Sequence, residues 1–286
     1  MEQLLANIHN AEQKHLYELY SYIAKVFSGT NLPSHDARHH LRVWLHCREL
    51  IIELYKAGID IPETLITNAI VACFFHDSGL AIDIGEIHGK LGGQICREYY
   101  SNRATQKDIN LDEIIEAIEF HDDKSVKSGP VYTPMSMKNL TRLVSTADDL
   151  DALGVIGVFR YTEIYLKRNI PDKELPKKVL QNLKNRFTSF TNAYSSLQKF
   201  SDKQRIRYLE IINFFSELDS QLILGEQNPD SQLAVYNIIK EHLIEKKQGI
   251  DETVEAAIKT STASYPLCFF SKLRGELNIT SALIPG

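Results

Sequence analysis

The sequence is poor in cysteine, and its four cysteines lie far apart. Cys47, Cys73, Cys96 and Cys268 form no C-x-x-C pair, so neither a zinc knuckle nor a dithiol redox motif is indicated. Three of them lie in apolar sequence of helical character, where a free thiol packs as a small hydrophobe. We therefore expect free thiols and a reducing compartment, the cytoplasm.

Long apolar runs and an excess of basic residues are also lacking. No stretch approaches the ~18 apolar residues that span a bilayer, and the N-terminal MEQLLANIHNAEQKH differs from a secretory signal. A formal charge of -5 lacks the clustered cations of a general nucleic-acid binder. We expect a cytoplasmic protein without a membrane segment and without general nucleic-acid binding; a small anionic substrate needs only a few local cations.

Strict two-residue alternation is almost absent, which predicts no sheet of consequence. Apolar residues instead recur at three- and four-residue steps, as at Leu4, Ile8, Leu19 and Ile23. With 43% hydrophobic and 24% charged residues, the composition is that of a globular protein. We predict an all-α fold with two parts: a site-bearing helical domain over residues 1–165, and a Lys-rich helical extension over residues 166–286 that packs on it or caps it.

Helix-stopping residues divide the chain into helices. Ser34 or Asp36 can cap a helix that runs to about Ala57, and another should begin near Glu63 and end at an adjacent His-Asp pair, residues 76 and 77. Further helices are expected over residues 88–100, 111–121, 137–148, 173–194, 203–224 and 231–247. The last thirty residues carry no structural prediction.

Histidines and aspartates gather near the expected helix ends, beside apolar sequence. They are His39, His76, Asp77, His88, His121 and Asp148. Imidazole nitrogen and carboxylate oxygen suit borderline divalent ions such as iron, manganese, zinc or nickel, and the absence of thiolates disfavours a structural zinc site. The pattern predicts a metal site, although other helical metal sites would fit it as well.

Three segments resemble the HD-domain metal-dependent phosphohydrolases. They are HDARHHLRV (35–43), similar to that family's H-D-x-x-H-x-x-R-V pattern, the doublet in FFHDSG (74–79), and STADDLDALGVIGVFR (145–160), similar to A-D-x-L-D-A-L-G. The resemblance implies an HD-domain helical bundle with additional C-terminal helices. It implies that the first metal ion is held by four ligands, His39, His76, Asp77 and Asp148. Asp151 would then be an outer acceptor that hydrogen-bonds a ligand.

His88 and His121 occupy the places where binuclear members of the superfamily add two histidines. If both bind, Asp77 bridges two ions; if not, they hydrogen-bond water or a substrate phosphate. Spacing alone does not decide between these alternatives. The expected cofactor is one or two divalent ions, with Mn, Fe, Ni, Zn and Mg all compatible.

Other polar residues carry weaker hypotheses. Lys124 and Arg160 are candidate substrate-binding cations, with a solvated surface charge as the alternative for each. Arg42 is expected to form a structural ion pair in preference to a phosphate clamp. The remaining histidines are interpreted as core or surface residues, and His35 also as an outer partner of His39: His9, His15, His35, His40, His46 and His242.

The leading functional hypothesis is metal-dependent hydrolysis of a phosphoester or phosphoanhydride in a nucleotide or small phosphorylated metabolite. Asp77, His88 and His121 would be the catalytic residues. One alternative is an HD-type di-iron oxygenase, and another is a catalytically silent nucleotide-binding regulatory protein. HDSGLAID lacks the lysine of the cyclic dinucleotide phosphodiesterases and the Glu-Asp pair of the alarmone hydrolases, so neither activity is predicted. The sequence leaves open the substrate, the native metal, the oligomeric state and the role of the C-terminal helices.

Overall fold

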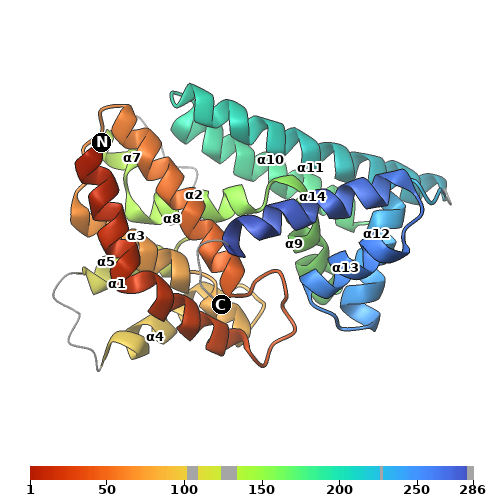
Figure 1. Ribbon diagram of the computed structural model, residues 1–286, viewed down its shortest axis with the longest axis horizontal. Helices are drawn as coiled ribbons and strands as arrows, with labels where there is room; N and C mark the ends of the chain where they lie inside the picture. Colours follow the sequence, from red (N-terminus) through yellow and green to blue (C-terminus); the bar gives the residue numbers. More distant parts are fainter. Residues whose placement is uncertain (102–108, 124–133, 226–227, 282–286) are drawn as a thin grey trace. The chain divides into compact units, whose positions relative to one another are not determined.

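The computed structural model describes residues 1–101, 109–123, 134–225 and 228–281. Within these ranges all regular secondary structure is helical and no strand occurs (Figure 1). The predicted all-α fold is therefore confirmed. None of the described helices combines the length and the apolar character needed to cross a membrane.

The chain divides into two compact units. The first comprises Met1–Thr30, His35–Asp151 and Ser189–Ser201, and the second comprises Asn31–Ser34, Ala152–Thr188 and Asp202–Gly286. Two long helices, α10 (Leu175–Tyr194) and α11 (Gln198–Leu224), contribute residues to both units. The predicted boundary at residues 165 and 166 stays a prediction.

The first unit is built around one central helix, α3 (Glu63–Phe75). Every residue of α3 from Leu65 onward is buried, because the helix contacts neighbours on several sides. These neighbours are α1 (Glu2–Phe27), α2 (Ala37–Lys56), α4 (His88–Ser101), α5 (Leu111–Glu119), α8 (Leu140–Asp151) and the 3-10 helix η1 (Ser78–Ala81). A helix that is apolar all round belongs in a core, so α3 carries its C-terminal His76 and Asp77 into the interior.

Local capping explains where the site-bearing helices begin. The Asp36 carboxylate accepts hydrogen bonds from the backbone amides of Arg38 and His39 and so starts α2, which decides between the two predicted caps. The predicted helix over 137–148 is displaced: α8 spans Leu140–Asp151, and Pro134–Met137 form a separate short helix, α7. The reason is Asn139, whose side-chain oxygen accepts a hydrogen bond from the Arg142 amide at 3.1 Å and caps the helix one turn later.

Two glycines let backbone segments come into contact around the start of α4. A Cβ at Gly79 in η1 would lie 2.0 Å from the carbonyl oxygen of His88, and a Cβ at Gly89 in α4 would lie 2.8 Å from that of Glu119. No side chain fits at either position without moving backbone. These close contacts fix the start of α4 against η1 and against the end of α5.

The second unit consists of helices packed on one another. Besides its parts of α10 and α11, it contains α9 (Gly154–Lys167), α12 (Gln232–Lys240), a π-helix η3 (Glu241–Glu245), α13 (Ile250–Thr260) and α14 (Ser264–Ser281). The α14 helix lies in the C-terminal segment without a structural prediction, and it contacts α9, α12 and α13. Its Glu276 carboxylate accepts a hydrogen bond from the Ile156 amide at 3.0 Å, which caps the N-terminus of α9.

Candidate metal centre

Four buried side chains from three helices form the first ligand group. His39 lies on α2, His76 and Asp77 follow α3, and Asp148 lies on α8. Each offers a ligand atom, and these atoms lie within 4.8 Å of one another. The Nε2 atoms of His39 and His76 are 3.2 Å apart, close to the separation of about 3 Å for two imidazoles that bind one ion at ~2.0–2.1 Å.

Asp77 also belongs to a second group, with His88 and His121. Its Oδ2 lies 3.3 Å from Nε2 of His39, whereas its Oδ1 lies 3.2 Å from Nε2 of His121 and 3.4 Å from Nε2 of His88. The two carboxylate oxygens of Asp77 therefore face different groups. This is the arrangement in which one carboxylate can be shared by two ions.

All four histidines point the same ring nitrogen into the cluster. Their Nδ1 atoms face acceptors outside it: Oδ2 of Asp151 at 2.8 Å for His39, and the carbonyl oxygens of Cys73, Gly85 and Ile118 at 2.9, 2.7 and 2.7 Å for His76, His88 and His121. A carbonyl oxygen only accepts, so Nδ1 carries the proton and Nε2 of the neutral ring has a free lone pair. This is the tautomer of a metal-binding histidine whose other nitrogen is held by an outer partner.

An outer layer centred on Asp151 orients His39. Asp151 is completely buried, and its carboxylate accepts hydrogen bonds from Arg42 Nε at 2.8 Å and Nη2 at 3.1 Å as well as from His39. The two-pronged Arg–carboxylate pair is the stronger kind of ion pair. The residue predicted as an outer acceptor thus contacts a ligand histidine, and Arg42 forms the expected structural ion pair.

The electrostatics of the cluster favour a positive charge. Burial alone would lower the pKa of His76, but the carboxylates of Asp77 and Asp148 outweigh it and raise that pKa to about 10. Burial alone would raise the pKa of Asp77, but the charge of His76 and the surrounding histidine hydrogen bonds hold it well below its usual range. Nitrogen and oxygen donors, all buried and around anionic carboxylates, fit a divalent cation.

A comparison with protein families agrees with this geometry. Residues 36–153 match the family model of the HD domain. These residues form an HD domain. The HD domain spans all six residues of the two ligand groups and also Asp151, so the predicted HD domain is confirmed. Neither a curated protein nor a solved structure matched the chain in the other two comparisons.

Two features of the site cannot be identified from the sequence: the packing of the His40 ring against two site histidines, and the backbone carbonyl oxygens that accept from the Nδ1 atoms. His40 is buried, in agreement with its interpretation as a core histidine, and its ring centroid lies 5.2 Å from that of His39 and 5.1 Å from that of His76. Burial, then the neighbouring His76 and His39, lower its pKa well below the usual value. The backbone acceptors follow one regular spacing: His76, His88 and His121 each donate from Nδ1 to the carbonyl oxygen three residues earlier.

The two candidate substrate cations have different outcomes. Lys124 lies outside the described residues. Arg160 lies on α9 in the second unit, where its side chain is buried, so it is not a solvated surface charge. Its role in binding substrate stays a prediction.

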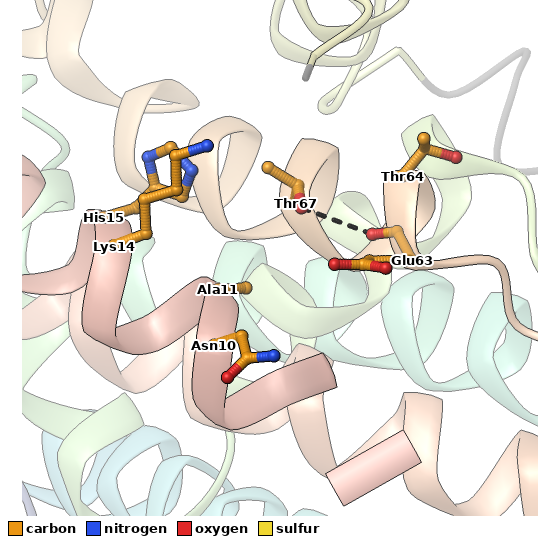
Figure 2. Close-up of a pocket in the computed structure, with 7 residues that line it drawn as sticks. All are labelled: Asn10, Ala11, Lys14, His15, Glu63, Thr64 and Thr67. Carbon is orange, nitrogen blue, oxygen red and sulfur yellow. Dashed lines mark hydrogen bonds between the residues drawn. The ribbon is translucent and has the colours of Figure 1, made fainter. Parts of the chain in front are cut away.

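A hollow of about 390 Å³ lies in the first unit between α1 and α3, and Figure 2 shows its lining side chains. Lys14 and His15 come from α1, and Glu63 and Thr67 come from α3, where the Thr67 hydroxyl donates to the Glu63 carbonyl oxygen at 3.3 Å. None of the six ligand residues lines this hollow. It is separate from the metal centre of the HD domain.

Proposed function

We propose that this chain is a metal-dependent phosphohydrolase that cleaves a phosphoester or phosphoanhydride of a nucleotide or small phosphorylated metabolite. One observation carries the proposal: four histidines, each fixed through Nδ1, direct Nε2 toward the two oxygens of Asp77. The match of residues 36–153 to the HD-domain family model supports it.

The residues divide into two ligand sets. His39, His76, Asp77 and Asp148 would hold the first ion, and Asp77 with His88 and His121 would hold a second. A divalent ion bound there would polarise a phosphoryl oxygen and lower the pKa of a bound water to about 7, which supplies a nucleophile near neutral pH. The protein's own contribution is to keep these side chains in fixed positions before substrate arrives.

Each side chain has a definable task in this scheme. The Arg42–Asp151 pair holds the His39 ring through its Nδ1 proton, and Asp77 aligns the two halves of the site because each of its oxygens faces one half. Where no second ion is bound, a protonated His88 or His121 can donate its Nε2 proton to the leaving oxygen of the substrate.

The test is a panel of nucleotides and phosphorylated metabolites offered to protein loaded with Mn, Fe, Ni, Zn or Mg. We expect release of phosphate or of a nucleoside monophosphate from at least one member, and loss of that release in the double variant His76→Ala with Asp77→Ala. His9→Ala is the matched control, since His9 is an exposed histidine outside the cluster. Undiminished turnover in the double variant would refute the proposal.

The di-iron oxygenase hypothesis has one observation in its favour, the carboxylate shared between two ligand groups. It requires iron and consumption of oxygen with a polyol or phosphonate substrate, so activity with manganese and indifference to oxygen would exclude it. The silent regulatory alternative requires tight binding of metal and nucleotide in calorimetry without product at any metal loading.

Several narrower statements stay predictions. They are the identity and number of the ions, a cytoplasmic location, the absence of membrane and general nucleic-acid binding, and oligomer formation. Elemental analysis of freshly purified protein and a measurement of its mass in solution test the first and the last of these.

A further inference from the structure

Exposed apolar side chains lie immediately before two of the ligand histidines. Ile87, which precedes His88, is 53% exposed, and Phe120, which precedes His121, is 42% exposed. Other large apolar residues of the first unit are also exposed, Tyr17 and Ile82 among them, and what distinguishes Ile87 and Phe120 is that each adjoins a histidine of the second ligand group. The ligand histidines themselves are buried.

The two positions lie at one junction between helix ends. Ile87 is the residue before α4, and Phe120 caps the end of α5. The start of α4 touches the end of α5, because a Cβ at Gly89 would lie 2.8 Å from the Glu119 carbonyl oxygen. The His88 and His121 rings meet edge to face with centroids 5.3 Å apart. The backbone at Ile87 and Phe120 therefore lies beside the part of the candidate site formed by these two rings.

The charged residues on the same segments are acidic. Residues 82–88 and 119–123 contain no lysine or arginine, although Lys90 and Lys124 lie just outside them in the sequence. Three carboxylates of these two segments are exposed, those of Asp83, Glu86 and Asp122. A second or third phosphate group near these carboxylates would be repelled. These carboxylates thus favour a substrate with a single phosphoryl group, the one that reacts beside Asp77, over a substrate with two or three.

We propose, on the basis of the proposed function, that Ile87 and Phe120 bind an uncharged, flat aromatic group of the substrate, which carries a single phosphoryl group. A phenyl face offers stacking to any aromatic ring, nucleobases included, and Ile87 adds apolar contact. The preferred substrates are aryl or nucleoside monophosphates. Nucleoside triphosphates and small aliphatic phosphates are poorer.

The experiment compares 4-nitrophenyl phosphate, adenosine monophosphate, adenosine triphosphate and glycerol phosphate as substrates of the metal-loaded protein. For Phe120→Ala we expect KM to rise about tenfold for the two aromatic monophosphates, the size of one lost stacking contact, with kcat and the KM of glycerol phosphate unchanged. Phe120→Trp should restore the low KM. Tyr17→Ala, which removes an exposed aromatic ring on α1, should leave all four substrates unaffected.

The metal content of the Phe120→Ala variant distinguishes a lost contact with substrate from a displacement of His121. Phe120→Ala should retain the wild-type number of ions; a loss of ions, an equal KM change for glycerol phosphate, or no KM change at all would overturn the inference. Glu86→Gln combined with Asp122→Asn should narrow the preference for the monophosphate over the triphosphate, and an unchanged preference would contradict the role of these carboxylates.

The two proposals fail in different ways. Turnover that is indifferent to Phe120 refutes the aromatic contact and leaves the hydrolase intact. If the wild type hydrolyses no member of the wider nucleotide and metabolite panel at any metal loading, the proposed function fails, and the contact is tested by equilibrium binding of adenosine monophosphate to the metal-loaded protein. Weaker binding in Phe120→Ala supports the contact, and equal binding overturns it.

Discussion

The backbone contact at Gly89 joins α4 to α5 and so sets the distance between His88 and the rest of the cluster. In Gly89→Ala the new Cβ would lie 2.8 Å from the Glu119 carbonyl oxygen and 3.3 Å from that of Ile118. Both atoms are backbone, so α4 must shift by roughly 0.6 Å to restore ordinary contact. His88, the preceding residue, moves with it, and we expect the second ion to be lost.

The expected size of the effect follows from two opposing contributions. Overpacking costs about 1–3 kcal/mol, and alanine in a helix contributes about 1 kcal/mol relative to glycine. The net destabilisation is up to about 2 kcal/mol. Gly275→Ala on α14 is the matched control, because nothing lies within 4 Å of its Cβ position, so it retains the propensity gain alone.

Differential scanning calorimetry and elemental analysis measure both consequences. Gly89→Ala should melt below the wild type and retain one ion per chain where the wild type holds two. Gly275→Ala should melt at or above the wild-type temperature with its ions intact. The reasoning is refuted if Gly89→Ala holds two ions and melts no lower than Gly275→Ala.

Three further predictions follow from other contacts. Asp151→Asn leaves the buried Arg42 charge without its partner and should lower stability by about 3–5 kcal/mol and metal affinity about 10- to 100-fold; calorimetric metal titration with unchanged affinity would contradict this. In the metal-free protein, the raised pKa of His76 stabilises the fold fully below about pH 6.5 and ceases to do so as pH rises toward about 10. The melting temperature of the chelator-treated wild type should therefore fall toward that of His76→Gln across this range, whereas a constant difference would argue against it. Glu276→Ala removes the cap on the Ile156 amide and should cost about 1 kcal/mol, visible as a lower melting temperature; no change would show that water replaces the carboxylate.

The parts of the fold that depend on local signals could be predicted from the sequence. Asp36 is a capping residue immediately before an amphipathic segment, and α2 begins beside it. The apolar run before His76 marks a helix that is buried on every side, and α3 has that character. The positions of the six ligand residues near helix ends follow from the same local patterns.

The parts that depend on packing between distant segments could not be predicted. The two-pronged contact of Arg42 with Asp151 joins residues more than one hundred positions apart, and no local pattern fixes its geometry. The same holds for Gly89, whose need for close approach becomes visible only when α5 is in place. The start of α8 differs from these cases, because it depends on a local signal, the Asn139 cap, that the predicted helix over residues 137–148 does not take into account.

The central claim is that Asp77 is shared by two ions held by separate histidine pairs, and anomalous diffraction from crystals of metal-loaded protein tests it most directly. The account predicts two peaks, one between His39, His76 and Asp148 and the other beside His88 and His121, each next to a different oxygen of Asp77. A single peak, or none, after metal loading would contradict it.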